Sequence, residues 1–155
     1  MIHTLTKPEW WAEKPTVYWI YGPTGTGKTK WASENFKDIY WKDETKWWDG
    51  YDRHKTIFID DFRASHMKFN CLLRLLDRYP FRCEIKGGYR WITSKNTIIT
   101  KNRRPSDMYQ LPDEDMQQLN RRIDKIIRFD NTGNMISQSQ KSGNIIWTSF
   151  NIISF

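Results

Sequence analysis

The chain has 155 residues, 38% of them hydrophobic, and its nine Trp, eight Phe and seven Tyr supply large side chains for the core of one domain. No apolar run approaches the ~18 residues that cross a bilayer, and the N-terminal region lacks the apolar segment of a secretory signal. Cys71 and Cys83 are too few for a disulfide scaffold, and the histidines fall at no metal-ligand spacing with them. We therefore expect an intracellular protein with no membrane association and no structural zinc.

The net charge is +7, and most of it lies in one segment. Between Arg82 and Arg104, seven basic residues accompany a single acidic one, so this window carries six of the seven net charges. Tyr89 and Trp91 lie inside it. Basic residues interleaved with aromatic ones are typical of a surface that binds nucleic-acid phosphates, although a basic face that contacts only solvent is an alternative.

The predicted elements alternate between strand and helix along most of the chain. Residues 1–16 are polar and contain two prolines, which indicates a lead-in or linker remnant. Short β-branched and aromatic runs predict strands, and helical spacing of apolar residues predicts helices. In chain order these are strand 17–21, helix 28–36, strands 39–41 and 56–59, helix 69–79, strands 81–85, 89–93 and 97–100, helix 115–122 and strand 126–129.

These elements predict an α/β fold for residues 17–130, with a mostly parallel central sheet flanked by helices. Ser65 is a candidate cap for the helix that Pro80 ends. Gly87-Gly88 marks a two-residue turn, which predicts an inserted β-hairpin. Residues 131–155 are rich in Ser, Asn and Gln without helical period, and we expect a flexible, loosely attached tail with one strand at 145–150.

The strongest motif is a full match to G-x-x-x-x-G-K-[ST] between the first predicted strand and the first predicted helix. It reads Gly22-Pro23-Thr24-Gly25-Thr26-Gly27-Lys28-Thr29. Its glycines let backbone N–H groups wrap around phosphate, and the helix N-terminus adds partial positive charge. Lys28 can then reach the β- and γ-phosphates, and the Thr29 hydroxyl can bind Mg²⁺. The motif therefore predicts a site for a nucleoside triphosphate.

Asp60 and Asp61 follow the apolar strand 56–59 and supply the carboxylates that such a site needs. We expect Asp60, nearer the strand, to bind Mg²⁺ with Thr29, and Asp61 to activate the attacking water. The two roles can also be exchanged between these neighbours.

Three further polar residues are candidates for catalysis. Asn102 follows strand 97–100 and can hold the water or sense the γ-phosphate, although Asn after a strand is usually turn chemistry. Arg121-Arg122 lies between a helix and a strand, where paired arginines are usually surface charge. In an oligomeric NTPase, an Arg so placed can reach the γ-phosphate of a neighbouring subunit.

Taken together, the motifs resemble the helicase domain of replication initiator (Rep) proteins of circular single-stranded DNA viruses, most of all circoviruses. The resemblance covers about residues 17–130 and rests on ordered blocks at 22–29, Trp48–Tyr51, Ile57–Phe62, Leu72–Pro80, Lys86–Gly88, Ile98–Asn102 and Arg121–Ile123. It implies a P-loop NTPase fold of the AAA+ kind and a superfamily 3 helicase. Such helicases form rings, usually hexamers, that hydrolyse ATP with Mg²⁺, move 3′ to 5′ on single-stranded DNA and act in the host nucleus.

The resemblance also assigns roles residue by residue. Residues 22–29 correspond to Walker A and Asp60-Asp61 to Walker B, while Asn102 corresponds to the motif C sensor. Lys86-Gly87-Gly88 corresponds to the start of the DNA-gripping hairpin, which extends the DNA-binding set to Tyr89 and Arg90. Arg121 or Arg122 corresponds to the arginine finger.

Two departures accompany the resemblance. Lys101 stands where the family leads us to expect a small residue, and it can either alter the sensor or add a DNA contact. The His-x-His and Tyr-x-x-Lys patterns of the nicking domain do not occur, so we expect a domain of a longer protein. Two other functions stay open from the residues alone, a small-molecule kinase on the same P-loop and a non-enzymatic nucleic-acid-binding module.

Overall fold

The computed structural model of the chain describes residues 14–23, 25, 27–62, 67–103, 105, 113–133, 135–142 and 146–150. Its elements are β1 (Thr16–Tyr21), α1 (Lys28–Asn35), β2 (Ile39–Lys42), β3 (Thr56–Ile59), α2 (Phe69–Leu75), β4 (Arg82–Ile85), β5 (Gly88–Trp91), β6 (Asn96–Lys101), α3 (Asp113–Arg122), β7 (Lys125–Phe129), β8 (Met135–Ser142) and β9 (Ile146–Phe150). Thr24, Thr26, Ser65 and residues 1–13 of the predicted lead-in lie outside the described residues.

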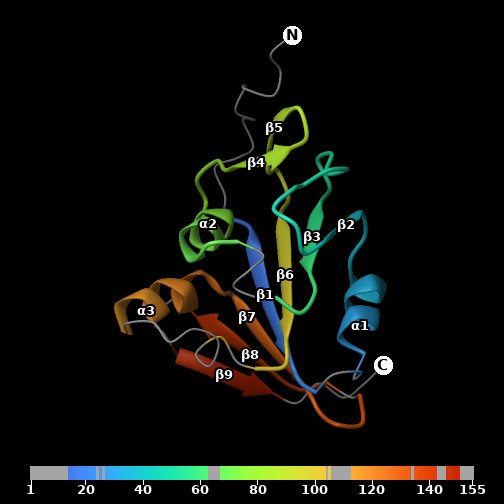
Figure 1. The fold of residues 1–155 in the computed structure, drawn as a ribbon. Coiled ribbons are helices and arrows are strands. Elements are labelled where there is room, and N and C mark those ends of the chain that lie inside the picture. The colour runs from blue at the N-terminus through green and yellow to red at the C-terminus, as the bar shows by residue number, and fades with distance from the viewer. Residues whose placement is uncertain are drawn as a thin grey trace.

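One sheet contains seven of these strands, in the order β2-β3-β6-β1-β7-β8-β9 (Figure 1). The strands from β2 to β7 in that order run parallel, whereas β8 and β9 are antiparallel. Ile98 of β6 pairs with Tyr18 of β1 on one side and with Phe58 of β3 on the other. Because parallel strands end together, the segments that follow β1, β3 and β6 meet at one edge of the sheet, which we call the carboxyl edge. The predicted fold class is confirmed.

Two cores lie on the two faces of the sheet, because side chains alternate along a strand. Trp19 and Ile99 belong to one core, and their chain neighbours Ile20 and Ile98 belong to the other. The second core includes Ala32 of α1, and Figure 1 shows α1 on one side of the sheet with α2 and α3 on the other. The first core is completed by leucines of α2, the turn after it and α3: Leu72, Leu73, Leu75, Leu76 and Leu119.

The predicted helix at 69–79 is shorter in the structure, since α2 ends at Leu75. Asp77 explains the early end, because its carboxylate accepts a hydrogen bond from the backbone N–H of Arg78 and so competes with helical bonding. The other predicted strands and helices of the central sheet are present within two residues of their expected bounds. Among the described helices, none has both the length and the apolar character needed to span a bilayer.

The tail expected at 131–155 contains two strands rather than one. β8 pairs with β7, and β9 pairs with β8, so this segment extends the sheet beyond β7. The β9 strand agrees with the expected strand at 145–150, whereas β8 was missed because its polar sequence has no alternating apolar pattern. β8 and β9 thus add two antiparallel strands to the sheet beyond β7, while the expected flexibility of residues 131–155 stays a prediction.

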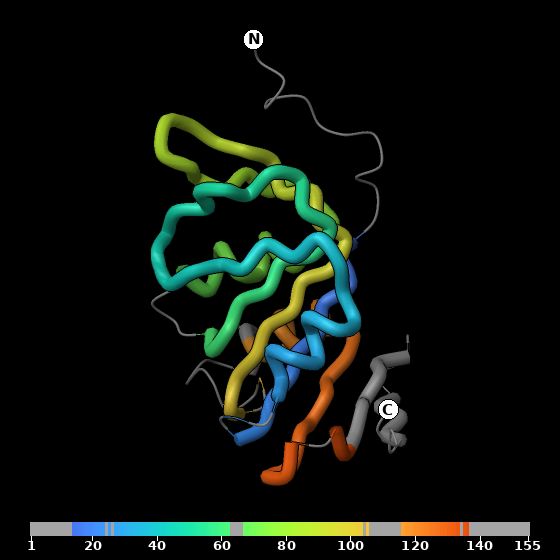
Figure 2. Tube along the Cα trace, turned by 90° about the vertical axis from the view of Figure 1, so that its right-hand side faces the viewer, coloured from blue at the N-terminus to red at the C-terminus, as the bar shows by residue number. Residues whose placement is uncertain are grey.

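The inserted hairpin β4–β5 lies at the end of the sheet opposite to the carboxyl edge. Figures 1 and 2 both show it beside the loop that joins β2 to β3, and the backbone N–H of Trp48 in that loop donates to the Glu84 carbonyl at 2.8 Å. The turn is one residue earlier than predicted, at Lys86-Gly87, since Ile85 pairs with Gly88. Gly87 has φ 99°, a left-handed conformation that favours glycine at this position.

Candidate functional site

The glycine loop connects the end of β1 to the start of α1 at the carboxyl edge. Gly25 and Gly27 have φ 80° and 87°, and Gly27 is the N-cap residue of α1. Side chains with a Cβ are strained at such φ values, so the loop needs glycine at both positions. The N-terminus of α1 therefore presents its free backbone N–H groups at this edge, as in anion-binding loops.

Gly22 is required for a different reason, namely the close approach of two strands. A Cβ on Gly22 would lie 2.6 Å from the carbonyl oxygen of Phe129, the last residue of β7. The backbone N–H of Gly22 donates to the Lys101 carbonyl at 3.2 Å on the other side. At the point where the chain leaves β1, Gly22 therefore packs closely between the end of β7 and the end of β6.

Lys28, the first residue of α1, reaches back across this loop. Its Nζ donates to the carbonyl oxygens of Gly22 at 2.7 Å and of Lys101 at 3.1 Å. Burial lowers the pKa of the Lys28 ammonium, and the positive charge of Lys101 adds to that shift. The charges of Asp60 and Asp61 oppose it, so both carboxylates lie close enough to act on Lys28 electrostatically.

Thr100 of β6 holds the two carboxylates that follow β3. Its hydroxyl donates to Asp60 Oδ1 at 2.8 Å and accepts the backbone N–H of Asp61 at 2.9 Å. Asp61 has φ 46°, a left-handed conformation that is uncommon outside glycine, and the bond to Thr100 helps to fix it. Thr100 is only 1% exposed, and the sequence analysis assigned it no role. The one sign of this role in the sequence is a hydroxyl directly after the apolar residues Ile98 and Ile99.

The end of β6 completes the site. Lys101 Nζ lies 3.4 Å from Asp61 Oδ1, and Asn102 follows it as an exposed residue. The next residue is fixed to the sheet, because the indole Nε1 of Trp19 donates to the Arg103 carbonyl at 2.9 Å. The predicted residues Gly22, Pro23, Gly25, Gly27, Lys28, Thr29, Asp60, Asp61 and Asn102 therefore all lie on segments that meet at the carboxyl edge.

Arg121 and Arg122 at the end of α3 have different environments. The Arg122 guanidinium donates to Asp77 Oδ2 and to the Gln118 carbonyl, both at 2.9 Å, and its side chain is only 14% exposed. Arg121 is exposed. Arg122 thus links α3 to the turn after α2 within its own chain, whereas Arg121 faces outward.

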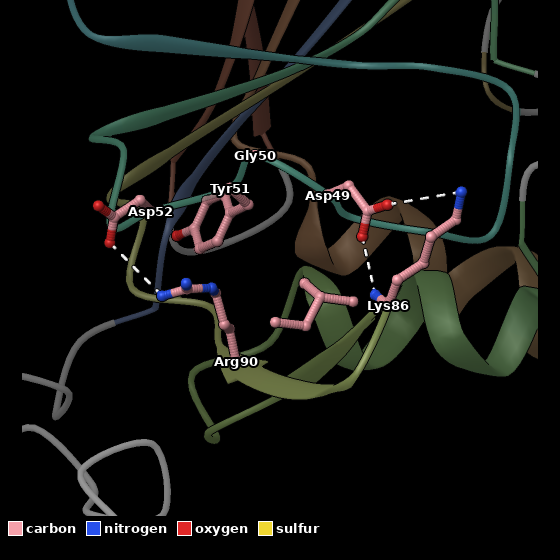
Figure 3. Close-up of a pocket in the computed structure, with 7 residues that line it drawn as sticks. Asp49, Gly50, Tyr51, Asp52, Lys86 and Arg90 are labelled. Carbon is pink, nitrogen blue, oxygen red and sulfur yellow. Dashed lines mark hydrogen bonds and ion pairs between the residues drawn. The ribbon is translucent and has the colours of Figure 1, made fainter.

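The hairpin brings Lys86 and Arg90 close to two carboxylates of the β2–β3 loop (Figure 3). Asp49 accepts the backbone N–H of Lys86 at 2.8 Å and lies 4.0 Å from its Nζ, while Asp52 Oδ1 lies 3.6 Å from Arg90 Nη1. Tyr51 lies between them, and together these groups line a cavity of about 280 Å³. Both ion pairs are exposed, so each contributes only about 0–1 kcal/mol to stability. Another anion can therefore readily replace the carboxylate in either pair.

The aromatic residues of the hairpin also differ. Tyr89 is 51% exposed, whereas Trp91 is half-buried. The Arg82 guanidinium lies over both rings, 5.1 Å from the Tyr89 centroid and 5.5 Å from that of Trp91. Tyr89 is therefore the ring of this pair that remains available to stack on a base.

The basic window does not form one surface. Lys101 lies at the carboxyl edge beside Asp61, whereas Lys86 and Arg90 lie on the hairpin at the opposite end of the sheet. The expectation of a single phosphate-binding surface is therefore wrong for the window as a whole. It contributes to two sites that β6 connects.

Comparisons with known proteins agree with this geometry. Residues 18–103, more than half of the chain, match the model of the RNA helicase family. The chain is 41% identical over 113 residues to the replication-associated protein of beak and feather disease virus, an alignment that covers 73% of this chain and 38% of that protein.

Two further relatives bear the same name. The replication-associated protein of porcine circovirus 2 is 42% identical over 109 residues, which cover 68% of this chain and 33% of that protein. The one of human associated cyclovirus 1 is 36% identical over 118 residues, which cover 72% of this chain and 42% of that protein. The chain thus spans less than half the length of these relatives, and the resemblance found in the sequence is confirmed.

The different environments of the two arginines predict different effects on stability. Arg122→Ala leaves half-buried Asp77 without its partner and should lower the free energy of unfolding by about 1–2 kcal/mol. Arg121→Ala, on the exposed side of α3, should change it by less than about 0.5 kcal/mol. Denaturant unfolding followed by tryptophan fluorescence measures both, and equal losses would contradict the assignment.

The same pair should contribute to acid sensitivity. Burial raises the pKa of Asp77, but hydrogen bonds from Arg78 and Arg122 and the Arg122 charge outweigh it, so the pKa is lowered. A lowered carboxyl pKa gives stability that is present above the unfolded-state value and lost as the pH falls through the folded-state value. The difference between the parent chain and Arg122→Ala should therefore shrink below about pH 4.

Proposed function

We propose, because this chain belongs to the RNA helicase family, that it is the ATP-dependent motor domain of a viral replication initiator. The observation that carries the proposal is the meeting of the glycine loop and Asp60-Asp61 at one edge of the sheet, through hydrogen bonds to the end of β6. Relatives named replication-associated proteins support the biological context. The motor moves 3′ to 5′ on single-stranded DNA, and its compartment is the host nucleus.

ATP binds with its phosphates in the glycine loop, at the N-terminus of α1. The backbone N–H groups of Gly25, Gly27, Lys28 and Thr29 donate to the phosphate oxygens, and Lys28 exchanges its two carbonyl partners for the β- and γ-phosphates. The carbonyl bonds hold the Lys28 ammonium over the loop before nucleotide arrives, so little reorganisation is needed.

The donor set at this edge suits Mg²⁺. Thr29 is exposed on the first turn of α1, and Asp60 is exposed while Thr100 orients its carboxylate through Oδ1. Hydroxyl, carboxylate and phosphate oxygens are the ligands that Mg²⁺ prefers. Bound there, the ion offsets negative charge on the phosphate oxygens.

Hydrolysis uses the groups beside that position. Asp61 accepts a proton from the attacking water, whose oxygen bonds to the γ-phosphorus as the bond to the β-phosphate oxygen breaks. Asn102 senses whether the γ-phosphate is present. ADP and inorganic phosphate are the products.

Single-stranded DNA binds on the hairpin. Lys86, Gly87 and Gly88 approach the backbone at the turn, Arg90 adds a second cation, and Tyr89 stacks on a base. The exposed carboxylates of Asp49 and Asp52 are replaced by phosphates when DNA binds. Such contacts weaken steeply with salt.

A neighbouring subunit completes the site in a ring. Arg121 is the better finger, because it is exposed, whereas Arg122 is held by Asp77 in its own chain. The two alternatives from the sequence lose support, since neither a small-molecule kinase nor a passive binding module is a helicase.

Lys28→Ala and Asp61→Asn should separate nucleotide binding from hydrolysis. Lys28→Ala should abolish Mg²⁺-dependent ATPase activity and weaken binding of a fluorescent ATP analogue, because the phosphates lose their ammonium. Asp61→Asn should bind the analogue but hydrolyse ATP at least about 100-fold more slowly, because no base accepts the water proton. Lys30→Ala, two residues along the same helix and exposed, is the matched control. Retained turnover in Asp61→Asn would refute the role of Asp61.

Mixing experiments test the arginine finger. Arg121→Ala retains its own Walker residues, and Lys28→Ala retains its own Arg121, so a mixture can form one intact site between subunits. We expect ATPase activity in the mixture where each variant alone is inactive. Arg122→Ala keeps Arg121, so it should already be active alone in proportion to its folded fraction, and mixing it with Lys28→Ala should restore nothing further. Full activity of Arg121→Ala alone would exclude it as the finger.

Lys86→Ala tests the hairpin. The substitution removes the ammonium but keeps the backbone N–H that bonds to Asp49, so the turn should persist. Affinity for a fluorescent oligothymidine should fall severalfold, with a smaller salt dependence, while ATPase activity without DNA stays unchanged. Lys37→Ala, an exposed lysine near the end of α1, should bind like the parent. Unchanged affinity of Lys86→Ala would remove the hairpin from the DNA site.

A further inference from the structure

Lys101 has no counterpart among the expected residues of the nucleotide site, yet the structure places it inside that site. It is the last residue of β6, between β1 and β3. Its carbonyl accepts the backbone N–H of Gly22 and the Nζ of Lys28, at 3.2 and 3.1 Å. Its own Nζ lies 3.4 Å from Asp61 Oδ1. One residue thus contacts the glycine loop through its backbone and the Walker B pair through its side chain.

The position of Lys101 separates it from the hairpin that we propose binds DNA. The hairpin and its basic residues lie at the opposite end of the sheet (Figures 1 and 2). The side chain of Lys101 is only 16% exposed, whereas that of Asp61 is 54% exposed. An ammonium so placed reaches the phosphates of a nucleotide rather than DNA on the hairpin.

The charges at this edge make the ion pair exchangeable. Two ammonium groups, from Lys28 and Lys101, face two carboxylates, from Asp60 and Asp61. A partly exposed pair at this distance contributes about 0–1 kcal/mol. A phosphate carries more negative charge than a carboxylate and offers more acceptor oxygens, so it competes well for the ammonium.

We propose that Lys101 binds the γ-phosphate and gives up its ion pair with Asp61 when it does so. Without a triphosphate, the Lys101 ammonium pairs with Asp61 Oδ1. When the γ-phosphate arrives, the Lys101 ammonium transfers to it and this ion pair breaks, after which Asp61 orients and deprotonates water. After phosphate leaves, Lys101 returns to Asp61. This inference rests on the proposed nucleotide site, and it adds a sensor on β6 next to Asn102.

The test compares nucleotide binding by the full 155-residue chain with Lys101→Met, which removes the charge and keeps most of the stem. Equilibrium titration with a fluorescent non-hydrolysable ATP analogue and with fluorescent ADP measures both affinities. We expect Lys101→Met to weaken the analogue about tenfold, as for one lost charge-assisted hydrogen bond, while ADP affinity changes less than about twofold. Lys101→Arg should retain most of the preference for the triphosphate.

Lys95 provides a matched control. It is exposed and lies directly before β6, far along the strand from Lys101, so Lys95→Met should bind both nucleotides like the parent chain. Equal weakening of the analogue and ADP by Lys101→Met would overturn the inference, because it would show a general effect on the site. Unchanged affinity for both would overturn it as well.

A double-substitution cycle tests the exchange between Asp61 and phosphate. Asp61→Asn should strengthen analogue binding more in the parent chain than in Lys101→Met, because only in the parent does it release a Lys101 ammonium. Equal strengthening in both backgrounds would contradict the exchange. If the parent chain and Lys28→Ala bind the analogue equally, the proposed nucleotide site itself is wrong. This comparison therefore distinguishes a failure of the nucleotide site from a failure of the role given to Lys101.

Discussion

The candidate nucleotide site depends on the end of β6. Two consecutive residues, Thr100 and Lys101, bond to segments from both sides: Thr100 to the pair after β3 and Lys101 to the loop after β1. The glycine loop follows β1 and the Asp60-Asp61 turn follows β3. These two strands do not pair with each other, because β6 lies between them in the sheet. The relative position of the glycine loop and the Asp60-Asp61 turn is therefore set by one strand that carries no part of either motif.

The same strand connects the two candidate sites. β6 begins shortly after the hairpin and ends at the carboxyl edge, so a displacement along it would affect both. At its start, the Tyr51 hydroxyl accepts the backbone N–H of Thr93 and bonds to the Ser94 hydroxyl. Tyr51 is only 1% exposed, and its two hydrogen bonds connect the base of the hairpin to the β2–β3 loop. If the two proposed sites bind nucleotide and DNA, this arrangement connects them through contiguous packed elements.

Several residues can be assigned only partly from the sequence, because tertiary contacts determine their environments. Arg121 and Arg122 are not distinguished by the sequence, because both end the same helix and only the contact of Arg122 with Asp77 separates them. Two roles were open for Lys101, since the end of the sheet at which its ammonium lies depends on the direction of β6 relative to its neighbours. The sequence also gives no sign of β8, whose place in the sheet follows from hydrogen bonding to β7 rather than from apolar alternation.

The local features can be read from the sequence: the glycine loop between a strand and a helix, the carboxylates that end an apolar strand, the hairpin, and the family to which they point. These depend on residues that are neighbours in the chain, where glycine conformations and apolar periodicity act directly. Which side chains meet depends on how the sheet is assembled. Asp60 and Thr100 are 40 positions apart, and Lys28 is 73 positions from the Lys101 carbonyl that it contacts. Such meetings depend on strand order and register, which are fixed only when the whole sheet packs, because local preferences do not encode distance across it.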